Sequence, residues 1–317
     1  MSRQIGIHRV VVTVAAAAGF VLAWSSGFLI PALLPVEVPW MTLLVWRFVP
    51  LAVVLVALAA VWSRHADRAL PPRRELTRIA LIGLVAQAGY CIFVYAAIGA
   101  GVAVGTTALI DAVQPLVVAT LVGPLLGLRV RGAQWAGLAL GAVGVALVVS
   151  SQFGGSDAVP LAYVLPALAM VCLITGTFLQ RRSESSAPII VVLGVHVAVT
   201  AIVCVVFAAV TGTLVPPMTA SFWASALLAA AIPTMAAYGL YWWLLDRVGI
   251  TALNALLFLI APTTALAGFL LLGEPLTALT VAGFALCGAG VAAVLVSESR
   301  SQRASARTPA RGAVSVE

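Results

Sequence analysis

Long apolar runs joined by short polar connections make up almost the whole chain. The hydrocarbon core of a bilayer is about 30 Å thick and takes about 20 apolar helical residues to cross. Windows of this kind occur at residues 11–31, 40–62, 77–98, 102–125, 133–151, 160–179, 188–211, 221–245, 250–272 and 278–296. The pattern predicts an all-α integral membrane protein with ten transmembrane helices.

Composition agrees with this reading. The chain is 63% hydrophobic and 9% charged, whereas soluble domains are about half apolar and a quarter charged. The first apolar run is longer than the about 7–15 residues of a secretory signal peptide, so we expect an uncleaved first helix. Residues 299–317 are rich in Ser, Ala and Arg without apolar periodicity, and we expect a disordered cytoplasmic tail there.

The arginines set the expected orientation. With the N-terminus inside, every arginine except Arg47 falls in an internal segment, and the external loops have none. Because positive residues collect on the cytoplasmic side, we expect a plasma (inner) membrane protein with both termini in the cytoplasm. The same placement explains the net charge of +7 without a nucleic-acid partner.

The second half of the chain repeats the first. Pro115 and Pro262 are 147 residues apart, and GLRVRGAQWAGLALGAVGVALVV aligns with GEPLTALTVAGFALCGAGVAAVLV. We therefore expect two five-helix repeats, residues 1–151 and 152–298. An odd number of helices per repeat makes the second copy insert inverted, as in many secondary transporters that bind solute near the membrane midplane.

Glycines recur in the last helix of each predicted repeat, at positions 137, 141, 144, 283, 288 and 290. Small residues let transmembrane helices approach closely. We expect these two helices to pack tightly, either against each other or against another subunit in a homo-oligomer.

Three stretches carry a family resemblance: VWRF around Arg47, PLVVATLVGPLLGLRVRGAQWAGLALGAVGVALV in the first repeat and APTTALAGFLLLGEPLTALTVAGFALCGAGVAAVLV in the second. With them, the chain resembles the drug/metabolite transporter superfamily, specifically the EamA-type ten-helix permeases, over about residues 11–297. The resemblance implies a membrane permease. The first repeat has Leu128 where the family's proline-then-LLGE pattern places Glu274 in the second, which suggests that this acid serves a helix end or a loop.

Arg47, Asp111 and His196 lie well inside predicted spans. An Arg or Asp at a helix centre costs about 2.5–3.5 kcal/mol, so such residues face the bundle interior or water. At about 1.5 Å per residue, Arg47 and Asp111 lie roughly 11 and 14 Å from the external end, and a salt bridge between them is feasible. It would serve as a gate opened by substrate or a proton, or as a permanent structural pair.

His196 is the inverted counterpart of Arg47. A histidine there could exchange protons near neutral pH or simply bond to a neighbouring carbonyl. Thr107, Asp111 and Gln114 form one polar stripe on their helix, and the matching stripe of the second repeat keeps only Asn254 as a polar residue.

Aromatic residues in the spans divide by depth. Trp24, Tyr90 and Tyr238 are deep and are expected to line a binding pocket, whereas Tyr95, Trp242 and Trp243 lie nearer span ends, where aromatic residues form interfacial belts. The prolines Pro115 and Pro262 are expected to kink their helices in mid-span, each freeing a carbonyl four residues earlier.

The chain has no HExxH, GxSxG or phosphate-loop pattern and no paired carboxylates, and its four cysteines lack metal spacing. We therefore expect neither an enzyme nor a metal or cofactor. The hypothesis is a secondary, non-ATP transporter, an exporter of amino acids, small metabolites or drug-like amphipathic solutes working by alternating access, with protons as a candidate coupling ion. The alternative left open is a non-transporting membrane scaffold or a lipid-handling accessory subunit.

Overall fold

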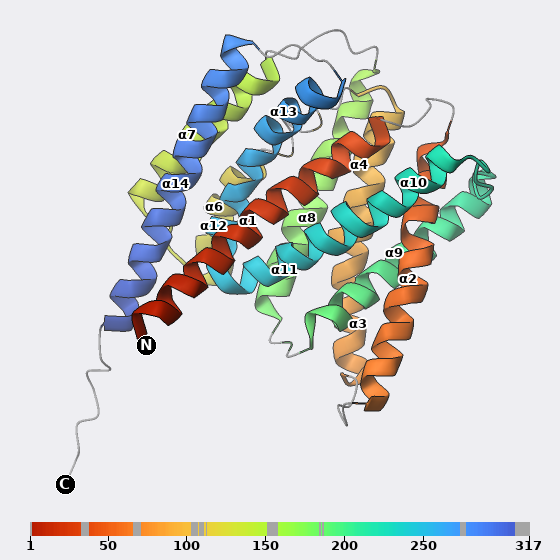
Figure 1. Ribbon diagram of the computed structural model, residues 1–317, viewed down its shortest axis with the longest axis horizontal. Coiled ribbons are helices and arrows are strands. Elements are labelled where there is room, and N and C mark those ends of the chain that lie inside the picture. Colours follow the sequence, from red (N-terminus) through yellow and green to blue (C-terminus); the bar gives the residue numbers. More distant parts are fainter. Residues whose placement is uncertain are drawn as a thin grey trace.

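Helices form the framework of the protein (Figure 1). The structure is a computed structural model, and it describes residues 2–32, 38–65, 71–102, 107, 111, 113–150, 158–183, 185, 187–272 and 277–307. Its helical elements are α1 (Ser2–Ala32), α2 (Trp40–His65), α3 (Arg73–Gly83), η1 (Leu84–Gly89), α4 (Tyr90–Gly99), α6 (Gln114–Leu126), α7 (Gly132–Ser150), η2 (Pro160–Tyr163), α8 (Val164–Arg182), α9 (Ile189–Thr211), α10 (Ala220–Ala229), η3 (Ala230–Ala236), α11 (Ala237–Val248), α12 (Ile250–Leu256), η4 (Leu257–Leu259), α13 (Ile260–Leu272) and α14 (Ala278–Arg307).

The bundle is apolar outside and holds polar side chains inside. In the described chain, eight helices are long and apolar enough to cross a membrane, and Gln114–Leu126 and Gly132–Leu147 are shorter apolar helices. Val210 is 83% exposed, whereas Arg47 and His196 are buried. Such a distribution suits hydrocarbon rather than water as the solvent. The chain is a multi-pass membrane protein, and these helices lie at the ten predicted positions.

The predicted span 102–125 differs most from the structure. Val113 lies in a turn, and α6 begins only at Gln114. Pro115 is therefore in the first helical turn, where its missing N–H breaks no bond of the helix. The described residues thus show a turn just before Pro115, and the predicted kink there stays a prediction. Residues 103–106, 108–110 and 112 lie outside the described residues.

Pro262 shows the same behaviour in the second half. It is the third residue of α13, which directly follows the 3₁₀ turn η4. The run from Ile250 to Leu272 is helical throughout, with the 3₁₀ turn just before the segment that holds Pro262. In both halves the proline therefore follows a local departure from regular α-helix.

The C-terminal end of the last helix also departs from expectation. Residues 299–307, expected to be part of a disordered tail, continue α14 as far as Arg307. Ala, Arg and Gln are good helix formers, and extending an existing helix needs no new nucleus. Residues 308–317 lie outside the described part of the chain.

The helices α7 and α14 show that the two halves are inverted copies. They lie side by side in Figure 1 and pack so closely that a Cβ added at Gly137 would be 2.7 Å from the carbonyl oxygen of Gly290. A Cβ at Gly144 would likewise be 2.7 Å from the carbonyl oxygen of Gly283. Because 137 matches 283 and 144 matches 290, the two contacts are copies of one another across antiparallel helices. The predicted close packing of these helices is confirmed, against each other.

A second reciprocal contact involves two wide π-helical turns. The elements η1 and η3 occur at matching places, 146–147 residues apart. Gly27 of α1 faces Pro233 in η3, and its counterpart Gly176 of α8 faces Ala86 in η1. These two contacts are the places where the first helix of each half meets the other half. Because π-turns often occur at functional sites, the region around them is a candidate site.

Hydrogen bonds between helix ends show which ends of the helices lie together at each end of the bundle. Arg78 Nη2 donates to the carbonyl oxygen of Arg182 (3.3 Å), and Arg182 Nε donates to that of Leu125 (3.2 Å). At the other end of the bundle, Thr42 Oγ1 donates to the carbonyl oxygen of Thr213 (2.7 Å). We call the first of these the arginine-rich end and the second the arginine-free end. Figure 1 shows α1 beginning and α14 ending at the arginine-rich end.

Candidate functional site

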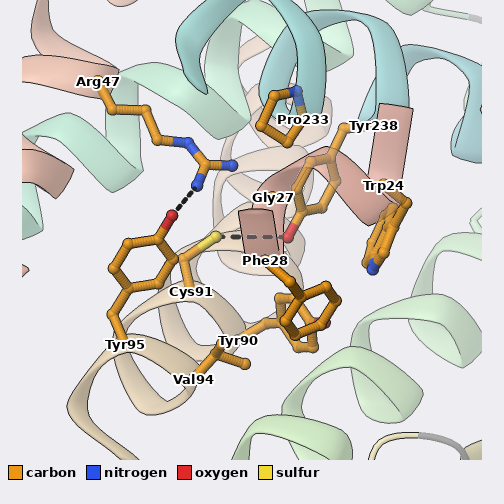
Figure 2. Close-up of a pocket in the computed structure, with 10 residues that line it drawn as sticks. All are labelled: Trp24, Gly27, Phe28, Arg47, Tyr90, Cys91, Val94, Tyr95, Pro233 and Tyr238. Carbon is orange, nitrogen blue, oxygen red and sulfur yellow. Dashed lines mark hydrogen bonds between the residues drawn. The ribbon is translucent and has the colours of Figure 1, made fainter. Parts of the chain in front are cut away.

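A small cavity of about 30 Å³ lies in the interior, between the two halves of the molecule (Figure 2). The first half supplies residues from α1, α2 and α4, and the second half supplies residues from η3 and α11. The lining residues are Trp24, Gly27, Phe28, Arg47, Tyr90, Cys91, Val94, Tyr95, Pro233 and Tyr238. The structure thus brings together four residues predicted separately from the sequence: Arg47, Trp24, Tyr90 and Tyr238.

Arg47 is the one charged side chain among the described residues that line this cavity. Its Nε donates to Thr234 Oγ1 at 2.6 Å and its Nη1 donates to the hydroxyl of Tyr95 at 2.9 Å. The guanidinium also lies 5.0 Å from the ring centroid of Phe48, a cation–π distance. Two hydrogen bonds and an aromatic face thus hold a buried cation without a carboxylate partner.

The predicted salt bridge between Arg47 and Asp111 is not formed. Asp111 instead accepts a hydrogen bond on Oδ2 from the hydroxyl of Tyr90 (3.1 Å), and its Oδ1 is buried without a partner. Arg47 and Asp111 were expected at similar depths, but each is hydrogen-bonded to hydroxyl groups instead: Arg47 to Thr234 and Tyr95, and Asp111 to Tyr90. The two charges therefore remain separately available to a third group.

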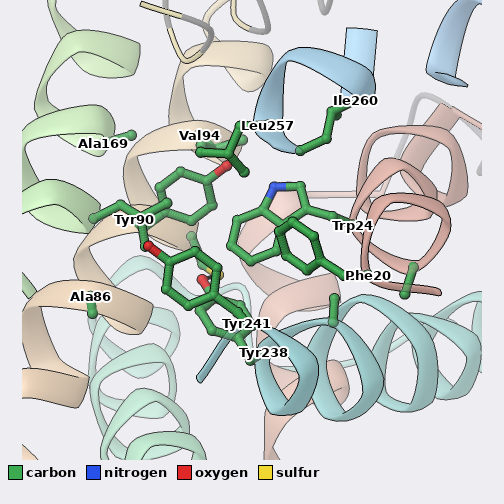
Figure 3. Packing of buried hydrophobic residues seen from close by; sticks show 14 of the residues in the cluster. Phe20, Trp24, Ala86, Tyr90, Val94, Ala169, Tyr238, Tyr241, Leu257 and Ile260 are labelled. Atoms are coloured by element: carbon green, nitrogen blue, oxygen red, sulfur yellow. Dashed lines mark hydrogen bonds between the residues drawn. The ribbon is translucent and has the colours of Figure 1, made fainter. Parts of the chain in front are cut away.

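A cluster of aromatic rings joins the two charged regions (Figure 3). Trp24 is at its centre, with ring centroids 5.7 Å from Tyr90, 5.1 Å from Tyr238 and 5.5 Å from Tyr241. Phe20 lies one turn before Trp24 on α1, at 5.4 Å. Tyr90 belongs both to this cluster and to the Asp111 hydrogen bond. The rings therefore close the interior around the cavity with apolar faces and a few hydroxyl groups.

The polar stripe of the first half meets the second half at one point. Gln114 Nε2 donates to Asn254 Oδ1 at 2.9 Å, and Asn254 Nδ2 donates back to the carbonyl oxygen of Ile250 at 2.8 Å. Thr107 is buried as well. The predicted stripe Thr107, Asp111 and Gln114 therefore lies inside the bundle, and Gln114 and Asn254 join the two halves directly.

His196 lies apart from the central cavity. Its ring packs edge-on against Trp242, with centroids 5.4 Å apart, and a Cβ at Gly83 would come 2.6 Å from the ring. Neither ring nitrogen has a partner at hydrogen-bonding geometry, although the backbone of Ile79 lies beside the ring. In the repeat His196 occupies the position equivalent to Arg47, and it lies toward the arginine-rich end of the bundle.

No group of three or more His, Cys, Asp and Glu side chains suited to holding a metal ion occurs among the described residues. The described side chains instead offer hydrogen-bond donors, one cation, one carboxylate and aromatic faces. Such a site can bind and release a polar solute.

The family is decided by comparison with known proteins. A model of the EamA-like transporter family matches residues 11–150 and 160–296. The chain belongs to the EamA-like transporter family. Members of this family are transporters rather than enzymes, and the two matched segments correspond to the two inverted halves.

The fold of this EamA-like transporter occurs in a solved structure. A crystal structure of another protein is 20% identical and covers 92% of this chain and 98% of its own, with a TM-score of 0.75. At that identity the likeness establishes the ten-helix fold alone. A search of curated proteins finds no match.

Sequence reasoning missed some residues of the site in this EamA-like transporter. Tyr95 was expected in an interfacial belt, yet it is 5% exposed and bonds to Arg47; Trp242, 2% exposed, is likewise buried. Nothing in the sequence around Thr234 singled it out as a site residue. Its repeat counterpart is Gln87, which is fully buried on η1, so pairing of polar residues across repeats would have singled out both.

Proposed function

We propose that this transporter is a secondary transporter of the plasma membrane, with both termini in the cytoplasm. It exports small amphipathic solutes such as amino acids, metabolites or drug-like compounds. The observation that carries the proposal is the central cavity, because both inverted halves line it and Arg47 lines it as a cation bonded to two neutral hydroxyl groups.

The chemistry of the cavity supports an amphipathic substrate. The guanidinium of Arg47 can accept an anionic group in place of its neutral hydroxyl partners, since hydrogen bonds between ionised groups are stronger than those to a neutral partner. Trp24 and Tyr238 offer apolar faces beside it. The free Oδ1 of Asp111 lies behind Tyr90 and can accept a cationic group or a proton.

The reciprocal contacts support alternating access. In the present arrangement Arg47 is bonded to Thr234 on η3, whereas the counterparts His196 and Gln87 have no mutual hydrogen bond. Two inverted halves can exchange such arrangements. Exchange would open the cavity first to one side of the membrane and then to the other, with the helix pair α7 and α14 remaining packed.

The position of Asp111 supports proton coupling. Protonation would neutralise a buried carboxylate that has one hydrogen-bond donor, Tyr90, and no basic partner among the described side chains. Each elementary charge that crosses the membrane contributes about 2.3 kcal/mol per 100 mV. A proton exchanged for solute at Asp111 therefore supplies enough free energy to drive export.

Counterflow in liposomes tests the proposal. Purified protein is reconstituted with a panel of amino acids, organic acids and amphipathic drugs, and net flux is measured with and without a proton gradient. Arg47→Gln and Asp111→Asn should abolish flux, whereas Arg129→Gln, which changes an exposed charge outside both cavities, should not. Absence of flux for every solute, with intact folding, would favour the scaffold or lipid-handling alternative.

A further inference from the structure

A second cavity, much larger than the central one, opens at the arginine-rich end between α8, α9 and α11. Its volume is about 400 Å³, within the range of about 300–1,000 Å³ that is usual for small-molecule sites. Its polar and aromatic lining includes Gln180, Arg181, Trp242, Trp243, Asp246 and Arg247. We call it the arginine-end pocket.

Two buried polar atoms in the arginine-end pocket lack partners. Trp242 is 2% exposed, and its indole Nε1 donates to no acceptor; the Oε1 of Gln180 is buried and accepts from no donor. Buried polar groups in folded proteins are nearly always hydrogen-bonded. One unused donor and one unused acceptor in the same pocket match a hydroxyl group, which can accept and donate at once.

Two aromatic contacts hold the ring of Trp242 in place. The ring of His196 packs edge-on against it, at 5.4 Å and 78°, and Tyr241 does the same at 4.9 Å and 87°. These two ring contacts hold the orientation of the indole and of its N–H. The part of the pocket lined by Trp242 is therefore preorganised.

The mouth of the pocket is charged. Arg181 Nη1 lies 3.9 Å from Asp246 Oδ1, and the two side chains are 35% and 81% exposed, so this ion pair is loose and solvated. The guanidinium of Arg247 lies 5.4 Å from the ring centroid of Trp243. The nearby carboxylate of Glu75 accepts a hydrogen bond from Ser185. Among the described lining residues, two guanidinium groups and one carboxylate carry charge, a balance of one positive charge.

We propose that the arginine-end pocket binds a small hydroxylated organic acid. Its carboxylate lies between Arg181 and Arg247, since guanidinium forks match carboxylates. Its hydroxyl accepts from Trp242 Nε1 and donates to Gln180 Oε1. Binding does not depend on transport; only the role of the pocket as an entry station on the cytoplasmic side rests on the proposed function.

Equilibrium binding to the purified full-length protein in detergent tests this, with 4-hydroxybenzoate as the probe. Two analogues isolate its parts: 4-hydroxybenzamide lacks the charge and benzoate lacks the hydroxyl. We expect the amide to bind at least about tenfold more weakly, because a hydrogen bond to a charged group contributes enough for such a factor. Benzoate should also bind more weakly than the probe.

Variants locate the site. Arg181→Gln and Arg247→Gln should each weaken 4-hydroxybenzoate about tenfold, while Arg129→Gln, which removes an arginine at the same end outside the pocket, should not. Gln180→Leu should weaken 4-hydroxybenzoate and leave benzoate unchanged. Size-exclusion profiles and melting temperatures confirm that each variant is folded.

Several outcomes overturn the proposal: no saturable binding of 4-hydroxybenzoate, equal binding of the amide, or equal effects of Arg129→Gln and Arg247→Gln. Liposome flux separates this failure from that of the proposed function. Binding without flux leaves the pocket as a ligand site, and flux without binding removes the pocket while the transporter remains.

Discussion

Arg47 in the first half of the chain and Thr234 in the second are joined inside the membrane by a hydrogen bond of 2.6 Å. The two residues come from helices 187 positions apart in the sequence. Thr234 also donates its own hydroxyl to the carbonyl oxygen of Ala229, five residues earlier, across the π-turn η3. The wide turn thus orients the hydroxyl lone pair toward the guanidinium, so the local irregularity of the helix has a consequence for the site.

The first prediction concerns this hydrogen bond. Thr234→Val keeps the shape of the side chain and removes the acceptor, so the buried guanidinium keeps only Tyr95 as a polar partner. We expect the protein to lose about 1.5–3 kcal/mol of stability, the usual contribution of a hydrogen bond to a charged group. Solute counterflow should fall with it. Thr234→Ser retains the hydroxyl and is the control; equal melting temperatures of the two variants would contradict the assigned bond.

The second prediction separates two glycines of α14 that are two residues apart. A Cβ at Gly290 would lie 2.5 Å from the carbonyl oxygen of Gly137, whereas one at Gly288 would meet nothing within 4 Å. Gly290→Ala should force the helices apart and destabilise the protein by about 1–3 kcal/mol. Gly288→Ala should be neutral or slightly stabilising, because alanine is the better helix former.

Melting curves in detergent, followed by size-exclusion chromatography, give the comparison between these two variants. A similar loss of melting temperature in both would show that α7 and α14 do not cross at Gly290. The same comparison also tests whether the exposed position 288 takes part in an oligomer, since only then would Gly288→Ala change the elution volume.

The third prediction concerns the carboxylate. Tyr90→Phe removes the hydroxyl that donates to Asp111 Oδ2 and keeps the ring in the aromatic cluster. We expect transport to fall more than tenfold while the protein stays folded, because the buried carboxylate loses a charge-assisted bond of about 1.5–3 kcal/mol. Tyr241→Phe is the matched control. Its hydroxyl bonds with Thr177 and not with the carboxylate, so flux should change little.

The fourth prediction concerns the amide pair between the halves. Gln114 Nε2 donates to Asn254 Oδ1 at 2.9 Å, and both side chains are fully buried. A double-mutant cycle with Gln114→Leu and Asn254→Leu should give a coupling free energy of about 0.6 kcal/mol, the average for hydrogen bonds between membrane helices. Additive losses of stability would mean that the bond is not formed in the membrane.

The framework could be predicted from the sequence because transmembrane helices are long apolar runs that are easy to recognise. Length and hydropathy sufficed for the ten positions, and the spacing of 147 residues sufficed for the repeat. The glycines predicted close packing of the two helices but left the partner open, and the contact of Gly137 with Gly290 was found only in the structure. The membrane requires backbone hydrogen bonds to be satisfied within each span, so few alternatives to helices remain.

The contacts within the site were less predictable. Depth along a helix suggested that Arg47 would meet Asp111, but pairing also depends on the direction in which each side chain points from its helix, and Arg47 bonds to Thr234 and Tyr95 whereas Asp111 bonds to Tyr90. Tyr95 and Trp242 were placed at the interface by their distance from a span end, yet both are buried. A polar side chain such as Thr234 becomes recognisable only when the repeat maps it onto a second buried polar residue, Gln87.

The last prediction tests the inverted topology itself. In a Cys172→Ser background, Arg129→Cys stands in the loop after α6 at the arginine-rich end, and Thr277→Cys stands before α14, in the corresponding connection of the second half. Inversion puts these two connections on opposite faces of the membrane. Cys91, Cys204 and Cys287 are buried and should not interfere.

An impermeant maleimide applied to intact cells should label Thr277→Cys, and also Met218→Cys, whose side chain is 86% exposed at the arginine-free end. Arg129→Cys should react only after the membrane is opened, because arginine-rich segments stay in the cytoplasm. If Arg129→Cys and Thr277→Cys reacted from the same side, the two halves would not be inverted. A cavity lined by both halves would then have no means of facing the two sides in turn, and the transport mechanism would have to be abandoned along with the topology.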